Sequence, residues 1–384
     1  MKIKQASLLT DAQAVKRATG KGLVQQAREI ARLKKLNPTL GATDYFTYRL
    51  YDKDFLGTWR PENFLGWRCQ VDLAHALNLR PLVGPAWDKF SFALIAHAFG
   101  LPVPRLRAVY MPGEAATSGV ADVALNGPDA LAQWLRTQTS WPLFAKPSYC
   151  QLGYGCHRFT GYRASDDSLL KRSGEAMTVD YFVNTVVSHP SSHFYVREMG
   201  YLFQDALRPH RSIAELLGNE TISGVRLVLI QDEGGVEVIG ALWKLATGGN
   251  DVDNTRGYST GNLTGGIDIE TGRLREVLSG YWPHADVVTK SPDTHRSLEG
   301  FVIPDWPKLI VLCTRAAAVF PLLRIQYWDI AVTDDGPRIL ELNDEGSVQG
   351  PQLWGRGFLT DRMRALLRDG AYGNKFEWLG VPAT

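Results

Sequence analysis

The sequence has few cysteines and no long apolar run. Only four cysteines occur in 384 residues, and their positions, 69, 150, 156 and 313, follow no regular spacing. A secreted domain held together by disulfides carries a denser and more regular set, so we interpret these residues as free thiols of a cytoplasmic protein. No run of about eighteen apolar residues occurs, and the N-terminal residues lack the apolar segment of a signal peptide. We therefore expect no membrane span.

The chain also lacks an excess of one charge. Its 42 lysines and arginines nearly balance its 40 aspartates and glutamates, which leaves a net charge of +2. This balance excludes a chain-wide basic surface, and we expect no nucleic-acid partner. Hydrophobic residues make up 45% and charged residues 21% of the sequence, as is typical of a globular protein, and the length indicates two or three structural units.

The order of the expected elements divides the chain into four regions, which we place at residues 1–85, 86–200, 201–354 and 355–384. The N-terminal region contains a basic amphipathic helix over 11–36 and an aromatic-rich segment over 43–69, and we expect most of the rings of that segment to form core. The C-terminal region contains one helix, near residues 359–369, and we interpret it as an appendage.

The two middle regions combine helices with strands. The earlier one contains a helix over 87–100, a strand that ends at Lys146 and a strand over 193–199, while the later one contains hairpins over 224–247 and 324–343. A Gly-, Asn- and Thr-rich loop over 248–266 separates these hairpins. Tight turns join antiparallel strands, so the pattern predicts largely antiparallel sheets and the α+β class.

The last hairpin carries three oxygen-bearing side chains. Asp329 lies in its first strand and Glu341 in its second, and a turn at 334–336 places these two positions nearly opposite. Asn343 lies on the same face as Glu341, because side chains alternate along a strand. Such oxygens suit a hard divalent cation such as magnesium. From the hairpin alone, a solvated polar face is an equally good interpretation.

A glycine-containing loop follows the strand that ends at Lys146. Residues 148–155 include Ser148, Gly153 and Gly155, and glycines allow backbone N–H groups to approach phosphate oxygens. The loop matches neither the P-loop nor the dinucleotide fingerprint, so an ordinary glycine hairpin is the alternative. Cys150 and Cys156 have no metal-finger spacing, and we assign them no role.

Two cations, Arg226 and Lys244, lie on the two strands of the 224–247 hairpin. A basic residue on a largely buried strand needs an anionic partner. That partner is either a bound phosphate or a carboxylate of the protein, and the sequence favours neither.

Taken in order, these motifs resemble the ATP-grasp superfamily. They are a helix that begins with Asp88 and Lys89 and is followed by GLPVP, a strand ending in KP before a glycine loop, a strand ending in glutamate, an arginine strand, and a D…E-x-N hairpin. Segments spread over residues 37–353 resemble the sugar-transfer-associated branch of that superfamily. The resemblance implies an ATP-grasp fold, in which two α+β subdomains with largely antiparallel sheets grip ATP.

The resemblance also implies roles for individual residues. On this resemblance the nucleotide is contacted by Lys146 and Lys89, its phosphates are covered by a lid formed by Ser148 to Gly155, and its ribose is contacted by Asp205. The adenine hinge is formed by Glu198, Met199 and Tyr201. The transferring phosphoryl group is held by Arg226 and Lys244, and Mg²⁺ or Mn²⁺ is held by Asp329, Glu341 and Asn343. Lys89 is assigned because no second lysine follows it in its helix.

The implied activity is that of an ADP-forming ligase that joins a small-molecule carboxylate to an amine, such as an amino acid or amino sugar, through an acyl phosphate. The implied assembly is a monomer or homodimer. One alternative is an ATP-grasp phosphotransferase that stops after phosphoryl transfer, and another is a nucleotide-binding scaffold without turnover.

Overall fold

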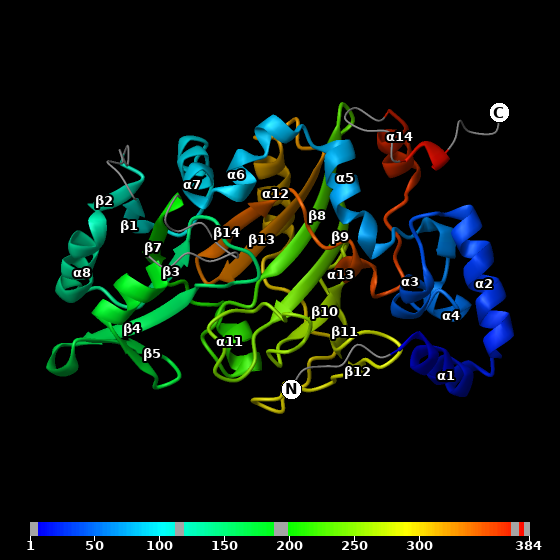
Figure 1. Cartoon of the computed structure of the whole chain (residues 1–384), viewed down its shortest axis with the longest axis horizontal. Helices are drawn as coiled ribbons and strands as arrows, with labels where there is room; N and C mark the ends of the chain where they lie inside the picture. The colour runs from blue at the N-terminus through cyan, green and yellow to red at the C-terminus, as the bar shows by residue number, and fades with distance from the viewer. Residues whose placement is uncertain (1–6, 112–118, 188–198, 370–375, 380–384) are drawn as a thin grey trace.

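Two seven-stranded sheets form the centre of the molecule (Figure 1). The computed structural model describes residues 7–111, 119–187, 199–369 and 376–379. The strands of the first sheet, in spatial order, are β2 (Ala121–Asn126), β1 (Leu106–Met111), β7 (Tyr201–Asp205), β3 (Leu143–Pro147), β4 (His157–Arg163), β5 (Ser168–Lys171) and β6 (Ala176–Thr178). Those of the second sheet are β12 (Asp286–Val287), β11 (Leu274–Ser279), β10 (Leu263–Ile267), β9 (Gly235–Leu245), β8 (Val225–Asp232), β13 (Ile325–Thr333) and β14 (Gly336–Asn343).

Both sheets are largely antiparallel, which confirms the expected α+β class. In the first sheet β1 and β2 pair in parallel, whereas β7 runs antiparallel to both β1 and β3. Tight turns join β8 to β9 and β13 to β14, as predicted for the two hairpins. β7 lies after the region boundary placed between residues 200 and 201, yet the structure assigns this strand to the first sheet.

Helices cover the sheets, and α7 (Lys89–Ala98) lies where the two sheets approach each other. Asp88 caps its N-terminus by accepting hydrogen bonds from the backbone N–H groups of Phe90 and Ser91. The remaining longer helices of this part are α8 (Gly127–Thr137), α11 (Arg211–Leu217) and α12 (Trp306–Ala317). Trp306, Leu309 and Cys313 of α12 are buried in the cluster that also holds Trp243 of β9 and Trp328 of β13.

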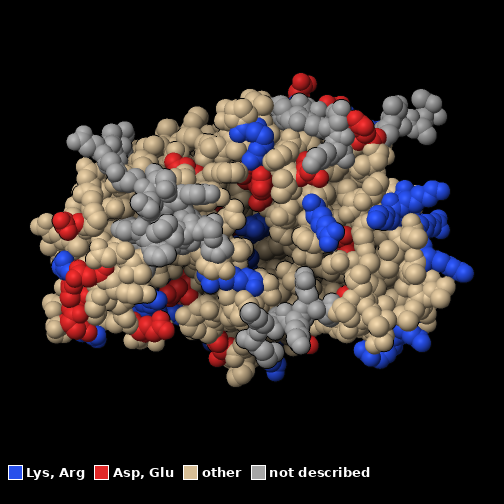
Figure 2. All heavy atoms as spheres, viewed as in Figure 1, with Lys and Arg blue, Asp and Glu red and all other residues tan. Residues whose placement is uncertain are grey.

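The N-terminal region contains two long helices instead of the single helix expected over 11–36. These are α1 (Leu8–Thr19) and α2 (Leu23–Leu36), followed by the short helices α3 (Ala42–Thr47), α4 (Lys53–Leu56), α5 (Gln70–Leu77) and α6 (Gly84–Trp87). Gly20 ends α1 with a φ of 74° and donates its N–H to the Lys16 carbonyl, a conformation that glycine adopts without strain. Figure 2 shows positively charged side chains gathered at the edge of the molecule where α2 lies in Figure 1.

Most rings of the aromatic segment form core, as expected, although Trp67 is exposed. Tyr45, Tyr48 and Phe64 are buried in a cluster that reaches Leu242 of β9 and Trp354. Aromatic side chains remove much apolar area from water, so this cluster attaches the N-terminal region to the second sheet.

The described residues near the end of the chain pack against the second sheet. After α13 (Gln349–Gln352), helix α14 (Asp361–Asp369) buries Met363, Leu366 and Leu367. They share a cluster with side chains of β8, β9 and β13.

Two further sequence expectations concern the strands. The loop predicted over 248–266 is shorter, because β10 begins at Leu263. The strand predicted over 193–199 lies almost entirely outside the described residues, which begin again at Met199. None of the helices in the described part of the chain is long and apolar enough to cross a membrane.

Candidate functional site

The centre of the second sheet brings three of the predicted site residues into one row. Asp329 of β13 pairs in register with Glu341 of β14 on one side and with Arg226 of β8 on the other. Residues that face each other across neighbouring strands have adjacent side chains. The register expected for the last hairpin is therefore confirmed, and Arg226 extends the row to a third strand.

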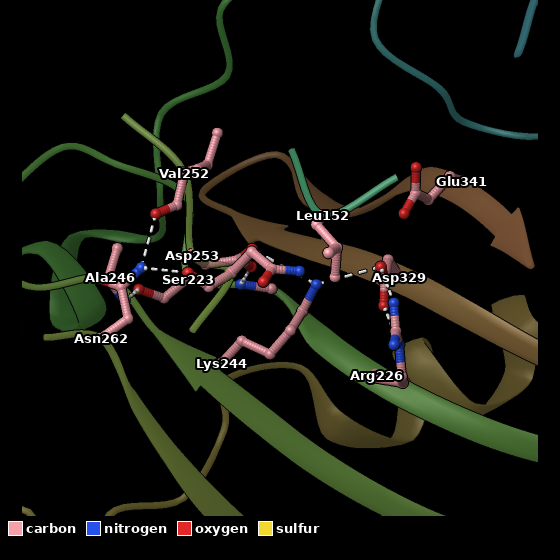
Figure 3. A network of polar contacts seen from close by, with 12 residues as sticks. Leu152, Ser223, Arg226, Lys244, Ala246, Val252, Asp253, Asn262, Asp329 and Glu341 are labelled. Atoms are coloured by element: carbon pink, nitrogen blue, oxygen red, sulfur yellow. Dashed lines mark hydrogen bonds and ion pairs between the residues drawn. The ribbon is translucent and has the colours of Figure 1, made fainter. Parts of the chain in front are cut away.

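Asp329 is the focus of a buried ion-pair network (Figure 3). Its side chain is 3% exposed and accepts two hydrogen bonds from Arg226, at 2.7 Å from Nε and 2.6 Å from Nη2. Lys244 Nζ donates to the Oδ2 atom of Asp329 at 3.1 Å. Burial opposes ionisation of Asp329, but the charges of Arg226 and Lys244 outweigh it and hold the pKa of this carboxyl well below its usual value. Arg226 and Lys244 thus have carboxylate partners, one of the two alternatives left open above.

Asp253 completes this network and was missed by the sequence motifs. Figure 3 shows Lys244 between Asp253 and Asp329, and its Nζ lies 3.4 Å from Asp253 Oδ1. The other oxygen of Asp253 accepts the backbone N–H of Gly224 at 2.8 Å. Burial raises the pKa of Asp253, an effect that the Lys244 charge partly offsets. The signal available in the sequence was the second buried cation, because two cations on adjacent strands call for more than one carboxylate.

Glu341 and Asn343 lie beside this network on β14. Asn343 Nδ2 donates to Glu341 Oε1 at 3.4 Å, so the two side chains share a face as predicted. With Asp329 they offer carboxylate and amide oxygens, the donors that Mg²⁺ or Mn²⁺ prefers. No group of three His, Cys, Asp or Glu residues suited to a metal occurs among the described residues. The predicted set is of a different kind, because Asp329 and Glu341 offer two carboxylates and Asn343 offers an amide.

Two lysines approach β14 from the side of the first sheet. Lys146, at the end of β3, donates to the Leu340 carbonyl of β14 at 3.4 Å. Lys89, the first residue of α7, lies 3.7 Å from Glu341. Figure 2 shows a recess near the middle of this face in which positively charged atoms are visible. The structure therefore brings Lys89 and Lys146 to the strand that carries Glu341 and Asn343.

The two lysines differ in their electrostatics. Burial, followed by the positive charge of Lys89, lowers the pKa of Lys146. Burial also disfavours the charged form of Lys89, but Cys150 and Glu341 together raise its pKa. Both shifts have causes at the site itself, as is common where side chains bind or transfer charged groups.

The glycine loop after β3 is anchored at both ends. The hydroxyl of Ser148 is buried and hydrogen-bonds to Asp88 at the start of α7. The Gly155 carbonyl accepts a hydrogen bond from the hydroxyl of Tyr201. Gly153 and Gly155 have φ angles of 68° and 72°, where glycine is favoured. At Gly153 a Cβ atom would also lie 3.3 Å from Val252.

Arg256 holds the middle of the glycine loop and was not identified from the sequence. Its guanidinium donates to the carbonyls of Leu152 at 3.1 Å and Gly153 at 3.2 Å, and it lies over the ring of Tyr154. Arg256 belongs to the segment between β9 and β10. This segment therefore contacts the ion-pair network through Asp253 and the glycine loop through Arg256.

Of the four residues predicted to contact the adenine or the ribose, the structure describes Met199, Tyr201 and Asp205. Glu198 lies outside the described residues, and Met199 is partly exposed just before β7. The Tyr201 ring packs with Phe203 in a cluster on the face of the first sheet opposite Leu202, the residue paired with Lys146, and its hydroxyl reaches the end of the glycine loop at Gly155. Asp205 ends β7 and lies 3.6 Å from Arg107. For Tyr201, whose ring is buried in that cluster, a hinge role would have to use the backbone.

Asp344 has a structural partner set next to the site. Its buried carboxylate accepts a hydrogen bond from Trp87 Nε1 at 2.9 Å and pairs with Arg80 at 2.5 Å. Arg80 also pairs with Glu345 at 3.1 Å. These contacts fix the end of β14 to the chain around α6, next to the N-terminus of α7.

Comparisons with known proteins agree with the motif order. A family model described as sugar-transfer associated ATP-grasp matches residues 68–367. A search of the curated proteins finds no match.

A search of the solved structures finds similar chains at low sequence identity. The biotin carboxylase domain of 2-oxoglutarate carboxylase from Hydrogenobacter thermophilus has 11% identity and a TM-score of 0.40, covering 78% of this chain and 48% of that one. D-alanine-D-alanine ligase from Helicobacter pylori has 11% identity and a TM-score of 0.38, covering 74% of this chain and 60% of that one. VanG D-Ala:D-Ser ligase from Enterococcus faecalis has 11% identity and a TM-score of 0.41, covering 74% of this chain and 62% of that one.

The chain spans between 48% and 62% of the length of these three proteins, so the assignment rests on the family model. That model covers most of the chain, and the protein belongs to the sugar-transfer associated ATP-grasp family, with the ATP-grasp fold that the motifs indicated.

Proposed function

We propose that this protein is an ATP-dependent, ADP-forming ligase that joins a small-molecule carboxylate to an amine through an acyl phosphate. The observation that carries the proposal is the meeting of the two sheets at β14. Lys146 bonds to the Leu340 carbonyl and Lys89 lies beside Glu341, while Arg226 and Lys244 lie one and two strands away from Asp329. The two lysines from the side of the first sheet thus approach the part of the second sheet that carries the carboxylates Asp329 and Glu341 and the cations Arg226 and Lys244.

The lysines of the first side are suited to bind the phosphates of ATP. A buried ammonium group gains most from a phosphate when its existing partners are neutral carbonyl groups, as for Lys146. The glycine loop, held at Ser148, Gly153 and Gly155, would cover the phosphates and exclude water. Met199 and Tyr201, with Glu198, would offer the backbone of the adenine hinge, and Asp205 would contact the ribose.

The carboxylates of β13 and β14 would hold Mg²⁺ or Mn²⁺. Asp329, Glu341 and Asn343 fit a hard cation by donor type, and a carboxylate that accepts bonds from Arg226 and Lys244 still has lone pairs to offer. The cation would neutralise part of the charge on the phosphate oxygens. Asp329 would also hold Arg226 and Lys244 in position.

Arg226 and Lys244 would act on the transferring phosphoryl group. The substrate carboxylate attacks the γ-phosphate of ATP and ADP leaves, and the amine then attacks the acyl phosphate and releases phosphate. Fixed cations stabilise the charge that spreads over the phosphoryl oxygens. A guanidinium has five N–H donors, so two bonds to Asp329 do not exhaust Arg226.

The test is product analysis with a panel of carboxylic acids, including amino acids and acidic sugars. The protein is incubated with ATP, Mg²⁺, each acid and hydroxylamine, which traps an acyl phosphate as a hydroxamate. Hydroxamate formed together with ADP and phosphate is the expected result. ADP with a stable phosphorylated acceptor would identify a phosphotransferase instead, and AMP with pyrophosphate would contradict both activities.

A further inference from the structure

The glycine loop brings two cysteines together. Cys150 and Cys156 lie at its two ends, and the chain between them reverses through two turns in which Tyr154 N donates to Gln151 O at 3.1 Å and Cys156 N to Gly153 O at 3.4 Å. Leu152, Gly153 and Gly155 all have positive φ angles, of 56°, 68° and 72°. The reversal brings the two side chains close enough for each thiol to shift the pKa of the other.

The surroundings of this pair favour a reactive thiolate. Both cysteines are partly exposed, and Lys89 Nζ donates to the Cys150 carbonyl at 3.2 Å. The hydrogen bond from the Cys156 thiol lowers the pKa of Cys150 against the effect of burial, and the charge of Lys89 adds to the lowering. The same hydrogen bond and burial raise the pKa of Cys156. One sulfur is thus set up as the nucleophile and the other as its proton-bearing neighbour.

The other two cysteines provide a contrast within the same chain. Cys69 and Cys313 are buried in separate hydrophobic clusters. Burial raises the pKa of Cys69 to about 12 and also raises that of Cys313. Buried thiols in apolar surroundings are inert toward oxidants.

We propose that Cys150 and Cys156 are an oxidation site at which a peroxide converts the two thiols into a reversible disulfide that closes the glycine loop into a covalent ring. The Cys150 thiolate attacks one peroxide oxygen, the O–O bond breaks, and the departing hydroxide takes up a proton as water. The sulfur, oxidised by two electrons, is then a sulfenic acid. The Cys156 sulfur attacks it, the S–S bond forms, the S–O bond breaks, and the hydroxide leaves with the Cys156 proton as a second water.

The ring would be formed beside the lysines of the candidate site. Its Cys150 carbonyl is the partner of Lys89, and Leu152, which is labelled in Figure 3, lies in its middle and is held there by Arg256. The oxidation chemistry needs only the cysteine pair and does not depend on the proposed ligase activity.

Peptide mapping tests the proposal on the full chain. Trypsin does not cleave before proline, so Lys146–Pro147 stays intact and residues 137–158 form one peptide that carries both cysteines and no other. The reduced protein is treated with one equivalent of hydrogen peroxide, denatured, alkylated with N-ethylmaleimide and digested. We expect this peptide to be unlabelled and lighter than its reduced form by about 2 Da, the mass of two hydrogens, and to become doubly labelled after dithiothreitol.

The peptides that contain Cys69 and Cys313 are the internal controls, and we expect them to be fully labelled throughout. Two labels on the 137–158 peptide after peroxide, equal oxidation of all four cysteines, or a disulfide between two chains would each overturn the proposal. In the Cys156→Ser variant, Cys150 should stop at the sulfenic acid and react with dimedone. A dimedone adduct on Cys69 or Cys313 instead would contradict the assignment of Cys150 as the nucleophile.

Discussion

The two sheets hold their buried charges in different ways. In the second sheet, Asp329 joins Arg226 at 2.6 Å and Lys244 at 3.1 Å, so opposite charges offset one another. In the first sheet, Lys146 bonds to a neutral carbonyl at 3.4 Å. Burial disfavours the charged form of both Lys146 and Lys244. For Lys244 the charges of Asp253 and Asp329 outweigh burial and raise its pKa, whereas for Lys146 burial and the charge of Lys89 outweigh Glu341 and lower its pKa. The second sheet is therefore already ordered by its own charges, and the first presents a cation that an incoming anion would stabilise.

Asp329→Asn should have the largest effect on stability, because it removes the buried carboxylate that pairs with Arg226 and leaves Lys244 with Asp253 alone. Removing one partner of a buried ion pair costs about 3–5 kcal/mol, and we expect the free energy of unfolding to fall by that amount in urea denaturation. Asp205→Asn is the matched control, since Asp205 is a half-exposed partner of Arg107 and such pairs contribute about 1 kcal/mol or less. Equal losses in the two variants would contradict the contrast.

Glu341→Gln should abolish turnover while leaving the fold intact. Loss of one charged group that stabilises the transferring phosphate costs at least about 100-fold in rate, measured as ADP release with the acid identified by the hydroxamate screen. Glu345→Gln is the control, because Glu345 pairs with Arg80 outside the row formed by Asp329 and Glu341. Unchanged activity in Glu341→Gln, with circular dichroism like that of the unaltered protein, would remove Glu341 from the metal set.

Lys146→Met should separate binding from stability. Hydrogen bonds to charged groups contribute about 1.5–3 kcal/mol, so the Kd for ATP should rise about 10- to 100-fold. The free energy of unfolding should stay constant or rise, because the variant removes a buried cation that bonds to a neutral carbonyl and that Glu341 offsets only in part. Calorimetric titration with ATP and urea denaturation are the two measurements, and a destabilisation as large as that of Asp329→Asn would show that Lys146 has an ionic partner.

The pH dependence of stability should show the same contrast as a smaller effect. The pKa of Asp329 is below its unfolded value of 3.8, so this group's contribution is present above pH of about 4 and is lost as the pH falls toward the folded pKa. The pKa of Lys146 is below 10.5, so the unfolded chain binds more protons just below that value and stability rises with pH there. In a plot of the free energy of unfolding against pH, Asp329→Asn should flatten only the slope at acid pH, and Lys146→Met should flatten only the slope at alkaline pH.

The last hairpin shows how much of the site the sequence could predict. Alternation along β14 places Glu341 and Asn343 on one face, and the turn at 334–336 sets the register that pairs Asp329 with Glu341. Both are local properties of a few consecutive residues. The same reasoning located the hairpin with Arg226 and Lys244, but it left their partners open.

The residues that were missed depend on contacts between distant segments. Asp253 pairs with Lys244 and accepts a hydrogen bond from the N–H of Gly224. Arg256 donates to carbonyls that lie about a hundred residues earlier in the chain. No periodicity or turn signal in the loop between β9 and β10 specifies either contact. The split of the predicted 11–36 helix has a local cause at Gly20, which the amphipathic pattern concealed.

The sequence by itself determined the order of the strands and turns, the position of the carboxylates on the last hairpin and the resemblance that led to the family. Those features follow from alternation, turn chemistry and motif order, which act over short stretches of chain. The tertiary structure decided which ionisable groups lie close together: Lys89 with Glu341, Lys244 with Asp253, and Cys150 with Cys156. Each of these contacts exists because packing of the sheets and reversal of a loop bring groups together whose mutual attraction is effective only at short distance.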